Sequence, residues 1–165
     1  MGIQTSVSYN PSAAIEGQVD GNGSPEERSY AAGVDITNGR LVVMGAADGR
    51  CRLPTAAGDI TGGTALGISR YRATSMVNWP AGQTVPYPQG VTVPVVRRGP
   101  VWVKVEEAVA PGDAVFVRHA SGAGGTALGA FRKSADTATA AQLPGAVYLD
   151  TAAANGLARV DLNLP

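Results

Sequence analysis

The sequence is poor in the residues on which most active sites, metal sites and disulfides depend. Its 165 residues include one histidine, one cysteine, two tryptophans and two phenylalanines. A single cysteine excludes an intramolecular disulfide and a thiolate metal cage, and a single histidine excludes a multi-histidine site. The 13 basic and 13 acidic side chains cancel, so composition argues against the basic face that nucleic-acid binding requires. No apolar run approaches the ~18 residues that span a membrane, and the N-terminus has no secretory signal pattern.

The few titratable side chains that stand together do not form a catalytic pattern. Glu26-Glu27 and Glu106-Glu107 are adjacent in sequence, so in an extended chain the two carboxylates of a pair point to opposite faces and cannot share a proton. We expect both pairs to be solvated or to form salt bridges with a neighbour. His119 has no partner for a catalytic triad, and we expect it in an exposed loop.

The glycine-rich segments also give no sign of a ligand site. Residues 58–67 and 122–129 lack the lysine and hydroxyl pair of a phosphate-binding loop. We expect Cys51 to be a small, partly buried apolar residue. The sequence therefore predicts no catalytic, cofactor-binding or metal site, and no enzymatic activity.

Glycine and proline are abundant, and they separate short runs in which apolar residues alternate. The 22 glycines and 11 prolines are typical of an all-β protein with substantial loops. The centre of the chain contains three such runs, in which valine recurs at every second position, and a turn signal follows each of the first two. A period of two indicates strands with one buried face. The pattern predicts three short strands, at 91–95, 101–105 and 115–117, with turns at 98–100 and 111–113.

The flanking regions add further elements. Residues 31–36 and 41–44 flank an Asn-Gly pair, which predicts a hairpin, and residues 64–71 predict another strand. Residues 134–142 have weak helix propensity. Residues 157–164 alternate so regularly that we expect a final strand built into the sheet and an ordered C-terminus.

The six-residue phrase GGTALG occurs twice, at residues 62–67 and 124–129. Two explanations remain open from the sequence. The repeat either records an internal duplication, with two similar strand-turn-strand units closing one barrel, or it is a chance recurrence of a simple turn.

The chain divides into two regions by composition. Residues 1–29 carry few large apolar side chains and show no sustained period, so we expect either a flexible tail or an extended arm that orders on another chain. Residues 30–165 are expected to form a single domain, a small β-barrel or β-sandwich of short antiparallel strands with long Pro/Gly-rich loops. The longest of these loops, residues 73–90, contains too many apolar residues for an idle linker.

The order of motifs resembles that of the capsid cement, or head decoration, proteins of tailed bacteriophages. The resemblance rests on GPVWV at 99–103 followed by PGDAV at 111–115, and on the closing phrases LPGAVYL at 143–149 and GLARVDL at 156–162. It implies a protein made in the cytoplasm of the host bacterium that binds the outer surface of an icosahedral capsid and stabilises the expanded shell. It further implies a homotrimer that contacts the major capsid protein, uses no cofactor and catalyses no reaction.

A covering protein of this kind needs apolar side chains that reach a partner. We expect the capsid or intersubunit contacts to come from the arm and from the long loop, namely from Ile3, Val7, Tyr9, Ile15, Met76, Trp79 and Tyr87. A second reading of the loop is that Trp79 and Tyr87 only seal the end of the barrel. The alternative function is a carbohydrate- or receptor-binding β-domain of a phage tail or fibre.

Overall fold

The computed structural model describes residues 14–20, 24–72, 86–121 and 127–165. It is all-β, with 47% strand and 4% helix, and contains a closed barrel of five strands with further strands attached. The predicted fold class is therefore confirmed. The elements in chain order are β1 (Glu26–Ala32), β2 (Leu41–Met44), β3 (Arg50–Arg52), α1 (Ala57–Thr61), β4 (Ala65–Ser69), β5 (Thr92–Lys104), β6 (Ala114–Arg118), β7 (Phe131–Arg132), β8 (Ala140–Tyr148) and β9 (Leu157–Asn163).

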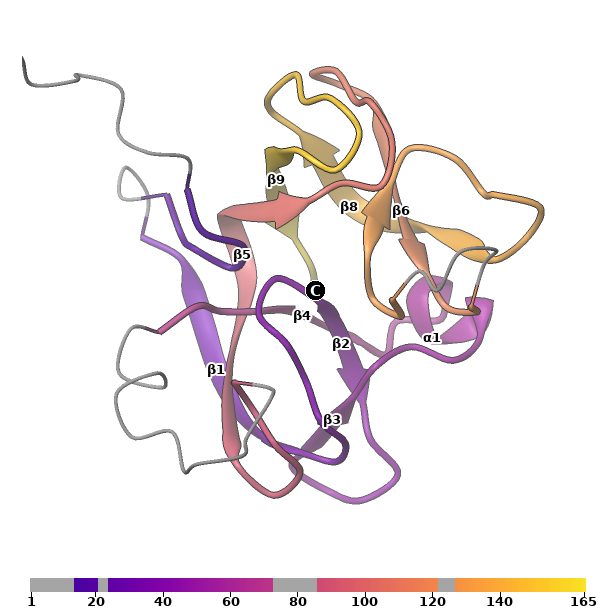
Figure 1. Ribbon diagram of the computed structural model, residues 1–165. Helices are drawn as coiled ribbons and strands as arrows, with labels where there is room; N and C mark the ends of the chain where they lie inside the picture. Colours follow the sequence, from indigo (N-terminus) through magenta and orange to yellow (C-terminus); the bar gives the residue numbers. More distant parts are fainter. Residues whose placement is uncertain (1–13, 21–23, 73–85, 122–126) are drawn as a thin grey trace, which may run out of the picture.

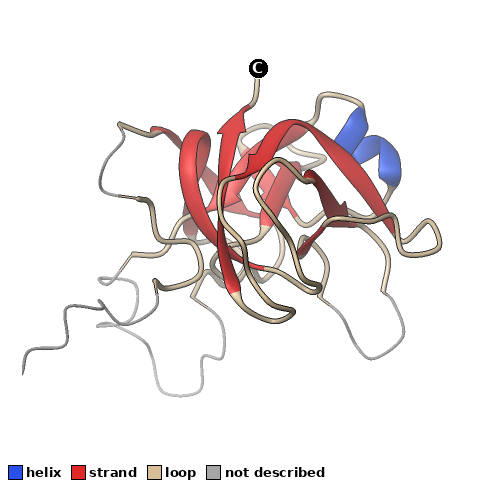
Figure 2. Ribbon diagram, turned by 90° about the horizontal axis from the view of Figure 1, so that it is seen from above, coloured by secondary structure: helices blue, strands red, loops and turns tan. Residues whose placement is uncertain are grey.

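Five strands from the first half of the sheet close the barrel. Their order is β1-β3-β2-β4-β5, and β5 pairs again with β1. All of these pairings are antiparallel except that of β1 with β3, which is parallel. Closure leaves the barrel without free sheet edges where these pairings run, which removes sites for unwanted strand pairing. Figure 2 shows the strands curving around the closed barrel.

The remaining strands extend from the second half of β5. They follow in the order β9-β8-β6-β7. A single parallel bridge joins Phe131 of β7 to Val105, the residue after β5. The last strand of the group therefore lies next to the end of β5, the strand on which the group begins. In Figure 1 this orange-to-yellow group lies to one side of the indigo-to-magenta strands, and β5 passes from one group to the other.

Each group of strands encloses its own set of buried side chains. The barrel interior holds Ile36, Val42, Leu66 and Tyr87 among others. The larger second core includes Val43, which lies next to Val42 in β2, because successive side chains of a strand point to opposite faces. Strand β2 therefore serves as a wall between the two cores.

Strand β5 corrects the prediction of two short strands separated by a turn. It runs without interruption for 13 residues through the segment predicted as a turn. Up to Arg98 β5 pairs with β1 and β4, and from Arg98 onward it pairs with β9, so the backbone changes partners in this segment without reversing direction. Gly99 has φ of 101°, a conformation that glycine adopts at little cost. The Gly-Pro pair therefore marks a change of partner within one strand.

The stretch with weak helix propensity forms no right-handed helix where the structure describes it. Residues 134–139 form turns, and Asp136, Thr137 and Ala138 have positive φ, which no right-handed helix permits. The one helix among the described residues, α1, lies where no helix was predicted. It begins where the Asp59 carboxylate accepts hydrogen bonds from the backbone N–H groups of Thr55 and Ala56.

Other strands predicted from the sequence are confirmed. Strands β2 and β4 lie within the predicted ranges or match them, and β9 confirms the ordered final strand. The two GGTALG phrases differ in structure where both are described. Ala65 and Leu66 belong to β4, whereas Ala127 lies just before a turn and Leu128 lies in that turn, outside the five-strand barrel. The phrase does not form two equivalent units of one barrel.

Candidate functional site

Residues 14–20 pack along the second half of β5, on the edge that is not paired with β9. The Gly17 N–H donates to the carbonyl oxygen of Trp102 (2.7 Å), and the Trp102 N–H donates to the carbonyl oxygen of Gln18 (2.8 Å). Val19 forms an isolated antiparallel bridge with Val101. These bonds make the segment, which we call the anchor segment, an additional partner of the central strand.

Gly17 is the tightest point of the anchor segment. Its φ is 84°, and a Cβ atom there would lie 2.8 Å from backbone atoms of Gly39, Ser69 and Tyr71. Real Cβ atoms do not approach backbone atoms so closely, so only glycine fits this position. The neighbouring Glu16 carboxylate pairs with Arg40 at 3.5 Å, although burial raises the pKa of Glu16.

The other end of the anchor segment is held by charge. The Asp20 carboxylate accepts a hydrogen bond from Arg159 at 2.6 Å, and Asp150 accepts two more from the same guanidinium at 2.8 Å each. The guanidinium carbon of Arg159 also lies 5.5 Å from the centroid of the Trp102 ring, a cation–π distance. Strand β9 thus fixes residue 20 through one side chain with three partners.

Ile15 is the exposed apolar residue of the anchor segment. Its side chain is 47% exposed, although its backbone forms a turn in which the Gln18 N–H donates to the Ile15 carbonyl oxygen at 2.9 Å. An apolar side chain held outward by ordered backbone is suited to contact a partner, because little conformational entropy is lost on binding.

The other predicted contact residues are divided between described and undescribed parts of the chain. Tyr87 is described: it is 2% exposed, forms a bridge with Ile36 and packs in the barrel core, and its hydroxyl donates to the Arg70 carbonyl oxygen. The rest of the predicted contact set lies outside the described residues: Ile3, Val7, Tyr9, Met76 and Trp79.

Sequence reasoning missed several exposed apolar side chains on the domain itself. Met44 is 55% exposed at the end of β2, and Val147 and Leu149 are exposed at the end of β8. Val34 is exposed as well and lines an open depression with Leu53. The sequence carried little signal for them, because all four residues of β2 are apolar and the apolar residues of β8 do not alternate regularly with polar ones.

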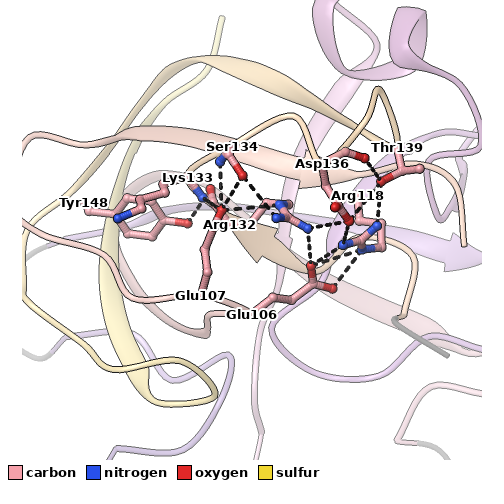
Figure 3. A network of polar contacts seen from close by, with 9 residues as sticks. All are labelled: Glu106, Glu107, Arg118, Arg132, Lys133, Ser134, Asp136, Thr139 and Tyr148. Atoms are coloured by element: carbon pink, nitrogen blue, oxygen red, sulfur yellow. Dashed lines mark hydrogen bonds and ion pairs between the residues drawn. The ribbon is translucent and has the colours of Figure 1, made fainter. Parts of the chain in front are cut away.

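A network of charged side chains ties the turn at 134–139 to the second group of strands (Figure 3). Arg118, which is 1% exposed, donates to Glu106 (2.6 Å) and to Asp136 (2.7 Å). Arg132 also lies within 3.2 Å of Glu106 and 2.7 Å of Asp136. Two arginines share two carboxylates here, so removing any one group leaves the buried charges of the others with fewer partners.

The second carboxylate of the adjacent pair holds the same turn from its other side. Glu107 accepts hydrogen bonds from the backbone N–H groups of Lys133 (2.8 Å) and Ser134 (2.9 Å) and from the Ser134 hydroxyl (2.9 Å). Of the two expectations for Glu106-Glu107, solvation or salt bridges with a neighbour, the structure shows salt bridges, and both carboxylates bind groups of their own chain. This network has the geometry of a structural contact and not of a catalytic site. We call it the clasp; it consists of Glu106, Glu107, Arg118, Arg132 and Asp136.

The remaining candidate residues occupy structural positions. Cys51 is fully buried, and burial raises the pKa of its thiol to about 11, as expected for a small apolar core residue. His119 is half-buried rather than exposed, directly after β6. Within the described ranges no three His, Cys, Asp or Glu side chains gather as a metal site. Over the same part of the chain, no helix is long and apolar enough to cross a membrane.

Comparison with known proteins connects this architecture to phage particles. The family model of the phage structural cement protein (E217 gp24/Pam3 gp6) matches residues 3–163. A chain in the solved structure of the capsid of Myoviridae phage XM1 shares the fold, with a TM-score of 0.71 and 18% identity over 99% of this chain and 98% of that one. The head fiber gp8.5 N base of bacteriophage phi29 is a weaker likeness, with a TM-score of 0.43 and 13% identity over 85% and 95%. No curated protein matches the sequence.

The family match favours the cement function over the carbohydrate-binding alternative, because it describes a structural protein and covers almost the entire sequence. The barrel, the second group of strands and the anchor segment all lie within the matched residues. The protein therefore belongs to the family of phage structural cement proteins and is a capsid-stabilising structural protein of the outer surface of the virion.

Proposed function

We propose that the protein acts as a homotrimer that binds subunits of the major capsid protein and stabilises the expanded form of the shell, without catalysing a reaction. The observation that carries the proposal is the family match over residues 3–163. The anchor segment supports it, because it holds the start of an arm rigidly on the domain.

The mechanism is thermodynamic linkage. A protein that binds the expanded shell and not its competing states lowers the free energy of the expanded shell in proportion to the occupied sites. Many copies arranged by symmetry convert modest contacts at each site into a large total. Such a mechanism requires complementary surfaces and no reactive side chains.

The contacts proposed for this mechanism come from the arm and the long loop. The anchor segment, which residues 1–13 precede in the sequence, is fixed by its bonds to Trp102 and Arg159. Contact by Ile15 is supported by its exposure. Because Tyr87 is buried in its own chain, its contribution would be to hold the loop in place. The full proposed set remains Ile3, Val7, Tyr9, Ile15, Met76, Trp79 and Tyr87.

A truncation that removes residues 1–13 tests the arm. Removing residues 1–28 would be a poor test, because it deletes Asp20 and the first residues of β1 along with the arm. The shorter truncation keeps every described contact of the anchor segment, so we expect its stability to be unchanged. Its affinity for shells purified without the protein should fall roughly tenfold or more, since exposed apolar anchors dominate binding energy.

A pair of point variants provides the matched control. Ile15→Ser removes an exposed apolar side chain at the root of the arm, and Met44→Ser removes one of similar exposure on the barrel. Weaker shell binding for Ile15→Ser but not for Met44→Ser would support the proposed contact. Full binding by both the truncation and Ile15→Ser would remove the arm from the mechanism.

A further inference from the structure

Five arginines gather where the N-terminal end of β1 meets β5 and the residues after β4. Arg97 and Arg98 belong to β5, Arg28 belongs to β1, and Arg70 and Arg72 follow β4. They surround two carboxylates, those of Glu26 and Glu27. We call these seven residues the arginine cluster.

The ion pairs inside the cluster are mostly long. Glu26 lies 3.5 to 3.7 Å from Arg28, Arg97 and Arg98 and forms no shorter pair with them. Arg72 lies 3.8 Å from Glu27, while Arg70 is in close contact with the same carboxylate. A β-bulge between Glu26 and Glu27 shifts the register at this point, and bulges commonly redirect side chains at functional edges of sheets.

The cluster carries excess positive charge in a protein that has none overall. Five guanidinium groups and two carboxylates leave a side-chain charge of three positive units, whereas the whole chain sums to zero. The adjoining segments 21–23 and 73–85 contain no charged residue in their sequence, so they do not compensate it. Three of the arginine side chains are more than half exposed: Arg28 at 59%, Arg98 at 53% and Arg72 at 51%.

The charge balance differs from that of the other arginine network of the protein. In the clasp at Glu106, Arg118 and Arg132 face three carboxylates of their own chain and are almost fully buried. In the arginine cluster each carboxylate is shared by two or three arginines that reach solvent. Exposed guanidinium groups with long internal pairs can exchange these for short bidentate pairs with an external carboxylate.

We propose that the arginine cluster is a docking surface for a carboxylate-rich patch on a protein partner. This inference rests on the proposed function, which makes the partner a subunit of the shell. Charged groups at such an interface accelerate encounter and set orientation more than they add affinity. Guanidinium groups match carboxylates in bidentate geometry, and the zero net charge of the whole chain argues against a nucleic acid as the partner.

The test compares charge reversal inside and outside the cluster in the full-length protein. Arg28→Glu reverses the most exposed arginine of the cluster, which pairs with Glu26 at 3.5 Å. Arg50→Glu makes the same change at an exposed arginine of β3 outside the cluster. We expect Arg28→Glu to bind purified shells roughly three- to tenfold more weakly at low salt and Arg50→Glu to bind like the unmodified protein. The difference should shrink at 0.5 M salt, where a Debye length of roughly 4 Å screens exposed charges.

Poly-glutamate provides a second readout that does not depend on shells. The unmodified protein and Arg50→Glu should bind the polymer at low salt, and Arg28→Glu should bind it more weakly. If the unmodified protein fails to bind shells, the proposed function is wrong, and the polymer measurement still decides the inference. Equal binding of the two variants to shells would overturn the inference. If shells are not bound at all, equal binding of the two variants to poly-glutamate would overturn it. Tighter binding to duplex DNA or to anionic phospholipid vesicles than to poly-glutamate would overturn the choice of a carboxylate partner.

Discussion

Glycine at position 67 shows how a single residue sets the distance between two strands. Gly67 lies in β4 opposite Val42 of β2, and its φ is 141°. A Cβ atom at this position would lie 2.1 Å from the carbonyl oxygen of Val96 in β5. The absence of a side chain therefore allows β4 and β5 to approach each other in the barrel wall.

Replacing this glycine should strongly destabilise the fold. We expect Gly67→Ala to lower the free energy of unfolding by roughly 3 kcal/mol or more, because both the backbone conformation and the contact with Val96 become strained. Gly58→Ala is the control, since its Cβ atom meets nothing within 4 Å and alanine favours the helix α1. Urea denaturation of both variants checks the prediction, and equal stability of the two would contradict it.

At the scale of single residues, the sequence predicted burial better than contact. Cys51 is a core residue, in line with the expectation that it behaves as a small apolar side chain. Tyr87 was assigned to a partner contact or to the end of the barrel, and aromatic character alone could not decide because tyrosine is common both in cores and at interfaces. Arg118 gave no sign of its burial, since that depends on carboxylates 12 and 18 residues away in sequence.

Structural elements in the second group of strands are held together by the carboxylates of the clasp. Burial opposes ionisation of Glu107, but hydrogen bonds from Ser134 and Lys133 and the charge of Arg132 outweigh it, so its pKa is lowered. The hydrogen bond from Arg118 lowers the pKa of Asp136. The turn at 134–139 therefore depends on ionised carboxylates.

This dependence predicts acid destabilisation. A carboxyl group with a lowered pKa in the folded state stabilises the fold above its unfolded pKa, roughly 4, and that contribution is lost as the pH falls through the folded value. Asp59 and Asp150 also have lowered pKa values, each through an arginine, whereas the raised pKa of Glu16 acts in the opposite direction. We expect stability to be nearly constant from pH 7 to about 5 and to fall below roughly pH 4.5.

Urea midpoints measured between pH 7 and 3 check this expectation. The variant Glu107→Gln removes one of the titrating groups, so it should be less stable at pH 7 and should lose less stability on acidification. A midpoint that rises on acidification, or a Glu107→Gln variant with an unchanged pH profile, would contradict the assigned role of the clasp.

Elements were predictable where a period was clear and unpredictable where partners changed. Strand β9 follows from local alternation, and β2 follows from a short apolar run directly after the Asn-Gly turn signal. The continuity of β5 through Gly99-Pro100 does not, because a Gly-Pro pair is also a common turn signal and only the pairing with β9 decides between the two. Likewise, residues 134–139 have the composition of a helix, but the clasp fixes Asp136 with positive φ.

The molecule as a whole is built on one long strand with an anchor segment along it. The barrel uses the first half of β5 and the second group of strands uses the other half, so the two groups are joined by continuous hydrogen bonding. This architecture was predictable only as an all-β class, because alternation does not specify which strands pair. Composition could only exclude some classes of function, and the family resemblance indicated the function itself.

The proposed oligomeric state belongs to this scale. We expect light scattering of the purified protein to give three times the chain mass of 16.7 kDa. Symmetric trimers match the three-fold positions of an icosahedral lattice, where each copy meets an equivalent environment. A monomer in solution that forms no trimer on the shell would contradict the homotrimer.

The central claim, stabilisation of the capsid, is tested most directly by the temperature at which purified expanded shells lose integrity as the protein is added. Linkage predicts that this temperature rises with the fraction of occupied sites and continues to rise with free protein at saturation, because binding favours only the intact shell. Unmodified shells without added protein provide the baseline. Shells that bind the protein to saturation yet fail at an unchanged temperature would contradict the account.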